Sequence, residues 1–483
     1  MKRSILSLAL GATLLSGCSF APTYVRPGLA APATLPQGGV YPAGGTPSVA
    51  VPDIAWRDFF TDASLRAVIA QGLENNRDLR VAVANIAQAR AQYRVQRADR
   101  LPTLNATAGA TYQHGSGVGQ AAGSGAGTGA GGAAATGATG VTTQFFNTGI
   151  GISSFELDLF GRIRNLSQAA LQTYLASEEA QRTVRISLIA EIATAYATMA
   201  ADQDLLRIST ETLATYKQTV DLTRAQFDQG VSSELEVQQA QTTYDQARYD
   251  IAAARTQIAQ DQNALNLLVG DTVPTTLLPN GLGDRQFTIA NLPAGVSSDV
   301  LLRRPDVLQA EHQLIAQNAN IGAARAAFFP TISLTGALGV LSGGLSHLFG
   351  NGTETWSAAP AVSLPLFDGG RNRGNLAYAQ ASRDAAVATY EKTVQTAFRE
   401  VADALATRGT IEEQVAARTN RAASARGAYT ISNARYRAGV DGFLTSLDAQ
   451  RTSYAADQDL VTTRLARVSN LVALYRVLGG GLS

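Results

Sequence analysis

Few residues of this 483-residue chain have the types and spacing that catalysis needs. Its histidines, His114, His312 and His347, are scattered and offer no cluster of metal ligands. Glu156 and Asp158 lie two apart at the end of an alternating segment, where they fit lumen-facing or junction residues better than an acid/base pair. The chain contains neither a G-x-S-x-G elbow nor a phosphate-binding loop. We therefore predict no catalytic residue, no metal site and no enzymatic activity.

Cys18, the only cysteine, is the residue whose context predicts a covalent modification. Two basic residues and a short apolar run lead to Leu15-Ser16-Gly17-Cys18, which resembles a bacterial lipoprotein signal. We predict a signal peptide over 1–17 and an N-acyl and S-diacylglycerol lipid on Cys18, with no other cofactor. Ser19 after the cysteine is typical of lipoproteins sent to the outer membrane of Gram-negative bacteria. The alternative is a chance cysteine after an ordinary signal peptide.

Charge and hydropathy limit the class of partner. The formal net charge is +1, so nothing indicates nucleic acid as a partner. After the signal peptide no run of about 18 apolar residues occurs, as a membrane-spanning helix requires. If the mature chain crosses a membrane, it must therefore do so as β-strands.

The chain repeats one architecture. Gly230, Leu235 and Gln241 recur at a constant offset as Gly439, Leu444 and Gln450. RADRLPTLNAT is echoed by RAAFFPTISLT, and FELDLFGRIRN by VSLPLFDGGRN. Because the repeating unit is far longer than a solenoid repeat, it predicts two pseudo-equivalent halves of one fold.

Each half contains a pair of segments with period-two alternation, the weak pattern of a transmembrane strand. The four segments are 103–113, 144–160, 331–341 and 355–367. Taken singly, each is equally explained as an ordinary half-buried strand, and the duplication favours the membrane. Four strands cannot close a barrel and open edges are not tolerated in lipid, so the sequence predicts self-association.

Each half also contains one very long helix. The segments 162–229 and 371–438 have no proline, and each would extend about 100 Å as a helix. Apolar residues follow heptad spacing, which indicates coiled-coil packing. The residues are Leu206, Leu213, Val220 and Phe227, then Val387, Tyr390, Val394, Ala397, Val401 and Ala404, and Ala240, Tyr244, Ala247, Ile251, Ala254 and Ile258 in the returning segment. Arg408 and Arg418 interrupt the second seam. Shorter helices, about 63–101, 232–269, 298–328 and 441–478, would stack end to end in pairs.

The chain resembles the TolC-like outer membrane factor family in four features taken together. These are the lipid signal, the CSFAPTYVRP opening, the duplicated helix–strand–strand–helix unit, and the turns FDQGVSSEL and YRAGVDGFL. The lipidated OprM-type efflux branch is the nearest. The resemblance implies a mostly α fold: a homotrimer with a long coiled-coil α-helical barrel and a twelve-stranded transmembrane barrel, four strands from each chain. It further implies an outer-membrane exit duct that extends into the periplasm and passively conducts substrates. A periplasmic adaptor (membrane fusion) protein and an inner-membrane pump would deliver them.

This resemblance assigns the domains. They are a signal peptide 1–17, a lipid-anchored tether and part of an equatorial collar 18–60, a first repeat 61–270 with return helix 232–269, an equatorial linker 271–297, a second repeat 298–479 with return helix 441–478, and a C-terminal end 480–483.

The two turns would be periplasmic tips that dock the adaptor. A glycine ends each long helix as a C-cap able to take positive φ. The tip residues are Phe227, Gly230, Val231, Leu235, Tyr436, Gly439 and Val440. An ordinary αα-hairpin is the alternative.

Leu444, Asp448 and Arg451 share one helix face and match the family positions of the closing constriction, so the resemblance makes them the gate. The first half has Gln239 where the second has Asp448, so the acidic ring would have three members. The alternative is an exposed ion pair between Asp448 and Arg451.

For the whole protein, the alternatives to efflux are the outer-membrane channel of type I protein secretion, a structural envelope lipoprotein that conducts nothing, and a porin-like general diffusion channel.

Overall fold

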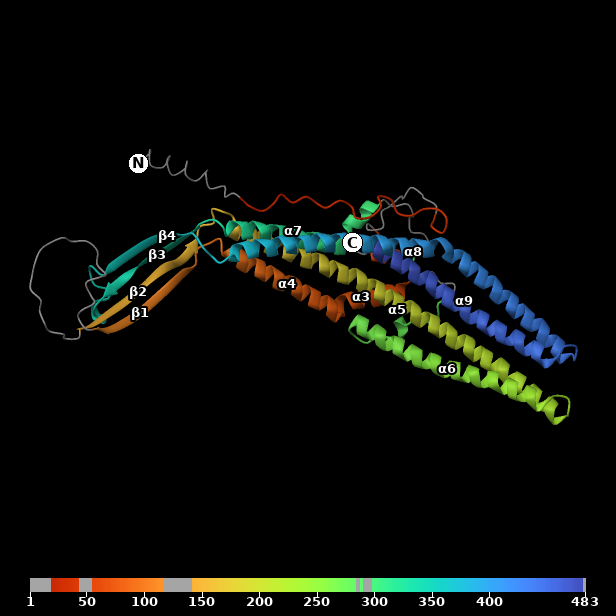
Figure 1. Cartoon of the computed structure of the whole chain (residues 1–483). Helices are drawn as coiled ribbons and strands as arrows, with labels where there is room; N and C mark the ends of the chain where they lie inside the picture. Colours follow the sequence, from red (N-terminus) through yellow and green to blue (C-terminus); the bar gives the residue numbers. More distant parts are fainter. Residues whose placement is uncertain (1–18, 43–53, 116–140, 284–286, 290–297, 481–483) are drawn as a thin grey trace, which may run out of the picture. The chain divides into compact units, whose positions relative to one another are not determined.

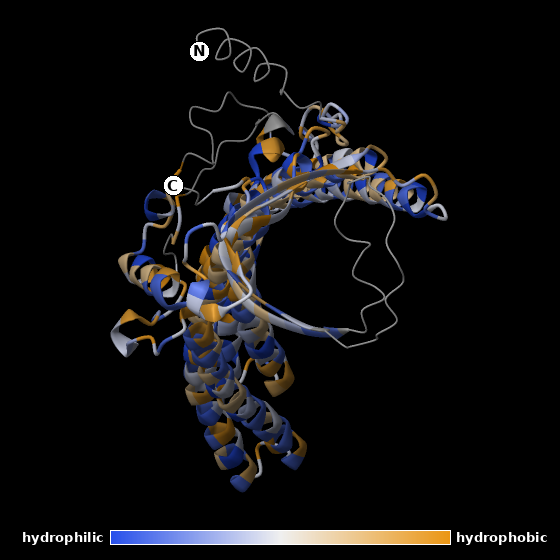
Figure 2. Ribbon diagram, turned by 90° about the vertical axis from the view of Figure 1, so that its left-hand side faces the viewer, coloured by the Kyte–Doolittle hydropathy of each residue, from blue (hydrophilic) through white to orange (hydrophobic). Residues whose placement is uncertain are grey.

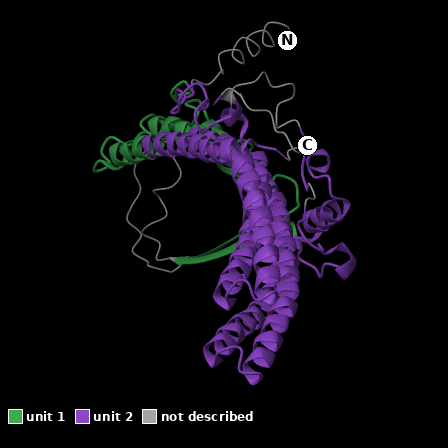
Figure 3. Ribbon diagram, turned by 90° about the vertical axis from the view of Figure 1, so that its right-hand side faces the viewer, with its two compact units in different colours: residues 1–24, 91–171, 315–383 green, residues 25–90, 172–314, 384–483 purple. Residues whose placement is uncertain are grey.

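The computed structural model describes residues 19–42, 54–115, 141–283, 287–289 and 298–480. Outside this part lie Cys18, the signal peptide, 43–53 of the predicted tether, 116–140 of the first repeat, 284–286 and 290–297 of the linker, and the last three residues. The described chain is mostly helical with one four-stranded sheet (Figure 1). It divides into two compact units, one of residues 1–24, 91–171 and 315–383, the other of 25–90, 172–314 and 384–483 (Figure 3).

The sheet belongs to the first unit and takes strands from both repeats. It consists of β1 (Leu104–Gly115), β2 (Val141–Glu156), β3 (Thr331–Ser342) and β4 (Glu354–Ser363), antiparallel in the order β1-β2-β3-β4. The sheet is curved (Figure 2). The β2–β3 pairing joins the two repeats, and β1 and β4 are edges within one chain.

The register gives the sheet one apolar and one polar face. Across the four strands, one row places Ala106, Ile150, Leu338 and Trp356 side by side. The adjacent row, on the other face, contains Thr107, Gly149, Gly339 and Thr355. Ile150, Leu338 and Trp356 are all exposed in the single chain, so the apolar face is not covered by its own helices. A transmembrane strand between lipid and a polar lumen requires apolar side chains on one face and polar side chains on the other, and this sheet has that pattern.

Both return strands end earlier than the alternation predicts. β2 ends at Glu156 and not at 160, because Asp158 Oδ2 accepts the Arg164 N–H (2.7 Å) and starts the next helix. β4 ends at Ser363 and not at 367, because Ser363 pairs with Thr331, the first residue of its partner strand β3. Leu157, Leu159, Leu364 and Leu366 therefore lie outside the strands. A bulge between Ile152 and Phe155, with Ser154 at φ 49°, also shifts the register of β2.

The long helices are α5 (Arg162–Asp228) and α8 (Arg371–Arg437), each of 67 residues. The returning helices are α6 (Glu234–Val269) and α9 (Phe443–Val477). The remaining described helices are α2 (Trp56–Phe59), α3 (Ala63–Asn75), α4 (Arg77–Ala98) and α7 (Pro305–Ala326), with 3₁₀ turns η3 (Thr275–Leu277), η4 (Ser298–Arg303) and η5 (Leu345–His347). Thus 63–101 and 298–328 are not single helices: the first breaks at Asn76, between α3 and α4, and the second at Arg304, between η4 and α7.

The two breaks hold the stacked helices together. Asn76, between α3 and α4, accepts the Leu79 N–H (2.8 Å) and donates to the Leu268 carbonyl at the end of α6 (2.7 Å). In the second repeat, Arg304 precedes α7 and donates to the Val477 carbonyl at the end of α9 (2.8 Å). Each side chain satisfies a carbonyl that a helix end leaves without a partner. In both repeats, a side chain at the break donates a hydrogen bond to a carbonyl at the end of the returning helix, although the residue types differ.

The heptad seams differ in burial. Tyr390, Val394, Ala397 and Val401 of α8 are fully buried, as the spacing predicts. On α5 the buried positions near the tip are Ser209, Tyr216 and Thr223, whereas Phe227 of the predicted seam is 37% exposed. Arg408 and Arg418 interrupt the α8 seam as ion-pair partners of Glu412 (2.5 Å) and Asp459 (2.7 Å). The first ion pair stays within α8, and the second joins α8 to α9 of the same hairpin.

By length and composition one described helix, α5, passes the test for a membrane span. Its most apolar window is 61% buried inside the structure, however, which is what the core helix of a helical bundle shows. The window is therefore weak evidence for a spanning helix.

Candidate gate and docking tips

The two hairpin turns have the same backbone geometry. Gly230 and Gly439 lie at φ 71° and 73°, in the left-handed region that favours glycine. The Gly230 N–H bonds to the Phe227 carbonyl (2.8 Å) and the Val231 N–H to the Gln226 carbonyl (2.8 Å). Gly439 and Val440 repeat these two bonds at 2.9 Å each. Both long helices thus end in a Schellman motif, the C-cap expected from the glycines.

Side chains close the two turns differently. In the first turn, Ser233 and Glu236 form a capping box at the start of α6. In the second, Arg435 holds Asp441 through two hydrogen bonds of 2.6 and 2.7 Å. This guanidinium keeps the pKa of Asp441 below its usual range. The tips therefore share a shape but present different charges.

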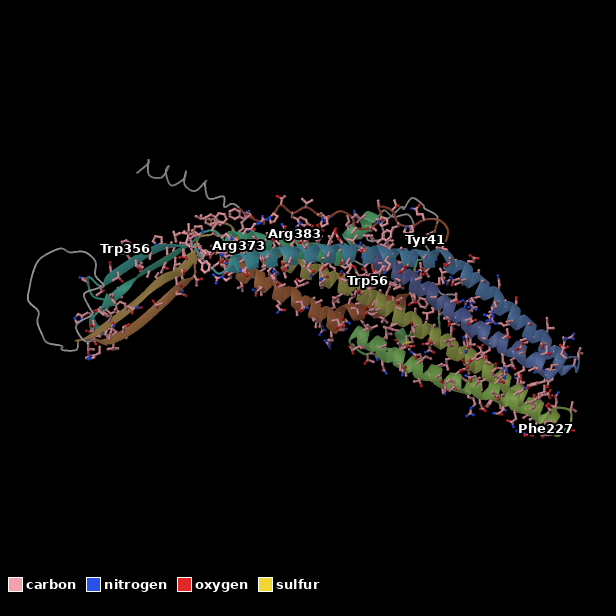
Figure 4. All side chains as sticks on the ribbon, viewed as in Figure 1. Tyr41, Trp56, Phe227, Trp356, Arg373 and Arg383 are labelled. Atoms are coloured by element: carbon pink, nitrogen blue, oxygen red, sulfur yellow. The ribbon has the colours of Figure 1, made fainter. Side chains whose placement is uncertain are left out.

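Exposed apolar side chains gather at the tips. Val231 and Leu235 of the first turn and Val440 and Leu444 of the second are each more than 60% exposed. Phe227 lies beside the first turn at the free end of its hairpin (Figure 4). Exposed apolar groups at a free helical end have no role in the fold of this chain, so they are available to a partner.

Tyr436 behaves differently from the other predicted tip residues, because it joins the two hairpins. Its hydroxyl donates to Gln226 Oε1 on α5 (2.6 Å), and its ring packs edge-on against Phe443 (5.8 Å between centroids). Phe443 and Leu447 are buried with Ala240 of α6. The bond and the ring contact therefore fix α8 and α9 against the first hairpin next to the tips.

The structure places Leu444, Asp448 and Arg451 together on the exposed face of α9. Phe443, Leu447 and Gln450 occupy its buried face. Within the part of the chain that the structure describes, Asp448 and Arg451 make no ion pair with each other, so the local ion pair considered above is not formed. The three side chains are presented to the surroundings of the single chain, as a constriction shared by several copies requires.

A second polar cluster above the tips was not predicted from the sequence. The Tyr454 hydroxyl on α9 lies 2.7 Å from Asp250 Oδ2 on α6 and 2.9 Å from Ser209 Oγ on α5. Tyr454 therefore donates to the carboxylate and accepts from the serine. Tyr216 packs edge-on against it at 6.2 Å. Burial raises the pKa of Tyr216 to about 12 and that of Tyr454 above its usual range. The polar heptad spacing of Ser209, Tyr216 and Thr223 was the available signal.

We expect Tyr454→Phe to loosen this contact. Losing a hydrogen bond to a charged group costs about 1.5–3 kcal/mol, so amide exchange in α9 near Tyr454 becomes at least about tenfold faster. Because both folded pKa values exceed the unfolded value, the stabilisation is complete below about pH 10 and is lost as the pH rises further. Hydrogen–deuterium exchange measures this. Tyr249→Phe, an exposed tyrosine on α6, is the control. Equal exchange in both variants would contradict the role of Tyr454.

The residues considered for catalysis have structural partners. Glu156 holds Arg162 through two hydrogen bonds (2.9 and 2.6 Å), and Asp158 caps α5, so both are junction residues. His114, His312 and His347 contact Thr142, Gln172 and Ser346, respectively. Among the described residues no three His, Cys, Asp or Glu side chains form a metal-binding group.

Relatives share this architecture over their full length. The family model described as outer membrane efflux protein matches residues 68–271 and 296–480. A probable efflux pump outer membrane protein of Pseudomonas putida, TtgC, is 45% identical over 100% of this chain and 96% of its own length. The outer membrane protein OprJ of Pseudomonas aeruginosa is 42% identical over 98% and 95%.

Solved structures agree. The open state of the MtrE outer membrane channel of Neisseria gonorrhoeae is 37% identical, with a TM-score of 0.84 over 96% of this chain and 99% of its own. A membrane protein of Pseudomonas aeruginosa reaches a TM-score of 0.87 at 40% identity, over 96% and 98%. The fold is thus that of outer-membrane channels, and the relatives are named as efflux proteins and not as enzymes. With its duplicated hairpins, two-faced sheet and full-length similarity, this chain belongs to the outer membrane efflux protein family.

Proposed function

We propose that three copies of this chain form the exit duct of a tripartite efflux system, passively conducting substrates out of the periplasm. The observation that carries the proposal is the four-stranded sheet, which exposes an apolar face and leaves β1 and β4 as edges. In lipid these edges must be paired, and pairing β1 of one copy with β4 of the next closes a ring. Three copies give the twelve strands that the family resemblance implies.

A periplasmic adaptor would bind the tips, and an inner-membrane pump would supply the energy. The exposed Val231, Leu235 and Val440 support an apolar docking surface at the end of the hairpins. Relatives are named as toluene and antibiotic efflux pump proteins, which favours small molecules as cargo over secreted proteins. The duct itself has no need of catalysis.

Leu444, Asp448 and Arg451 would form the gate, with Asp448 repeated three times around the axis. A unit charge ~8 Å from the axis is worth about 0.5 kcal/mol in water before screening, and a Debye length of ~10 Å at 0.1 M salt leaves about 0.7 kcal/mol for three charges. Three carboxylates would therefore concentrate monovalent cations roughly threefold and dilute monovalent anions roughly threefold. We therefore expect Asp448→Ala to lower the cation-to-anion permeability ratio by about an order of magnitude in planar bilayers. Gln239→Asp, at the equivalent position of the first repeat, should raise the ratio. Unchanged conductance and selectivity in Asp448→Ala would remove these residues from the gate.

A lipid on Cys18 would anchor the mature chain to the outer membrane. Ser19 and Phe20, the first residues described after Cys18, support a fixed start for the mature chain. The Ser19 hydroxyl donates to Asn165 Oδ1 (3.0 Å), and Phe20 stacks on Phe329 (4.6 Å between centroids). Intact mass spectrometry tests the anchor: the purified protein should carry the mass of a diacylglycerol and one acyl chain, and Cys18→Ser should carry neither. An unmodified Cys18 would contradict it.

A further inference from the structure

A basic cavity lies where the mature N-terminus meets the helices that lead into the sheet. It has a volume of about 410 Å³ and belongs entirely to the unit that contains the sheet. Its walls come from the N-terminal segment, the turn after α4, the first turns of α5 and the middle of α7. They include Ser19, Tyr24, Arg100, Arg164, Asn165 and Asn318.

Arginine provides the charge of this cavity. Arg100 donates through Nη2 to the Arg164 backbone carbonyl (3.2 Å), and the exposed Arg164 also lines the cavity. No aspartate or glutamate lines the cavity, and among the described residues neither arginine has a carboxylate partner. Of the neighbouring carboxylates, Glu156 pairs with Arg162, and Asp99 accepts from Gln96 (2.6 Å). Asp158 accepts the backbone N–H of the cavity residue Arg164 through Oδ2, and its buried Oδ1 has no hydrogen-bond partner among the described residues.

The cavity also contains a buried amide with an unused donor. Asn165 is 4% exposed, and its Oδ1 accepts the Ser19 hydroxyl. Its Nδ2 has no hydrogen-bond partner among the described residues. Two guanidinium groups and polar amides around one space match a phosphate group, which accepts several hydrogen bonds and carries negative charge.

The place of the cavity identifies the source of the phosphate. Arg100 precedes β1 by a few residues, and Arg164 follows β2, so both lie at the helix–strand junctions. With the sheet in the outer membrane, these junctions lie at the level of the periplasmic headgroups. Basic pockets at the headgroup level of helical membrane proteins bind anionic lipid headgroups, and the same chemistry fits a basic pocket at this junction.

We propose that this cavity binds the phosphate of a membrane phospholipid, beside the lipid-modified end of the chain. The proposal rests on the outer-membrane placement of the sheet and not on the gate or the adaptor. A bound lipid would fix the height of the barrel in the bilayer independently of the acyl chains on Cys18.

Native mass spectrometry of the full lipidated protein in detergent tests the site. Bound phospholipid is first washed away, and the acyl chains on Cys18 remain. The protein is then titrated with phosphatidylglycerol, with diacylglycerol as a probe that lacks phosphate, and with inorganic phosphate as competitor. We expect one phosphatidylglycerol per chain and no retention of diacylglycerol. Arg100→Gln with Arg164→Gln should weaken phosphatidylglycerol binding at least about tenfold, because two charge-assisted contacts are lost. Arg373→Gln, an exposed arginine of the same unit outside the cavity (Figure 4), should bind as the unchanged protein does.

The charge-preserving pair Arg100→Lys and Arg164→Lys separates charge from folding and should retain phosphatidylglycerol. Equal binding by the glutamine pair, or equal binding of diacylglycerol, would overturn the proposal. If inorganic phosphate competes at the same concentration as phosphatidylglycerol, the ligand of the cavity is a free anion and not a phospholipid, which also overturns the proposal. Planar-bilayer conductance of the same preparations tests the exit duct separately from the lipid site. If the unchanged protein binds no phosphatidylglycerol but conducts normally, the lipid site is wrong and the proposed duct still stands.

Discussion

Leu338→Arg is expected to abolish assembly of the protein in the outer membrane. Leu338 lies on β3 between Ile150 of β2 and Trp356 of β4, on the exposed apolar face of the sheet. With this face in contact with lipid, an arginine near the middle of the strand costs about 2–4 kcal/mol in each chain. Because every copy contributes the same strand, the cost is multiplied in the assembly. Outer-membrane fractionation and the yield of folded oligomer measure the loss.

Ala337→Arg is the matched control, since it adds the same side chain one residue away. Ala337 pairs with Gly151 and Ser357, on the opposite face of the sheet. On a polar lumen face an arginine remains hydrated, so assembly should continue while conductance or ion selectivity changes. Equal loss of assembly in both variants would remove the assignment of the lipid face. Loss of assembly only in Ala337→Arg would reverse it.

The second large effect is expected at the first tip. Leu235→Asp should reduce efflux to the level of a strain that lacks the protein, while the protein still assembles. Leu235 is 66% exposed, so the fold tolerates the change, but an unpaired carboxylate buried in a docking interface costs at least about 2 kcal/mol. That is a roughly thirtyfold weaker interaction. Susceptibility of cells to an exported toxic compound measures the result.

Leu235→Met controls for the apolar character of this position. Methionine preserves volume and hydrophobicity, so efflux should remain near that of the unchanged protein. If Leu235→Asp exports as well as Leu235→Met, the first tip does not dock a partner.

Backbone regularities of this protein were predictable because they depend on local chemistry. The absence of proline predicted both long helices, and each glycine cap ends its helix within a residue or two of the expected position. Strand ends were less predictable. The apolar alternation continues to Leu159 and Leu366, but the last backbone bond of β2 is from the Leu157 N–H to the Ile332 carbonyl. Pairing of β4 ends at Ser363, opposite the first residue of β3.

Tertiary polar contacts could not be predicted in the same way. Asn76 and Arg304 perform equivalent roles in the two repeats with unrelated side chains, so the repeat gives no sequence signal for them. Tyr454 joins Ser209 and Asp250 across long sequence separations, and nothing local distinguishes it from the exposed Tyr249. The face shared by Leu444, Asp448 and Arg451 followed from helical spacing, whereas their assignment as the gate depends on the family resemblance.

Photo-crosslinking in cells from position 231 tests the central claim most directly. A photoreactive residue replaces Val231, which is 76% exposed at the first tip, and a second variant carries it at Phe349, which is 83% exposed between β3 and β4. The account predicts capture of a periplasmic adaptor of an efflux pump from position 231 and none from position 349. Capture of no adaptor from position 231, or equal capture from both positions, would contradict an exit duct loaded at its tips.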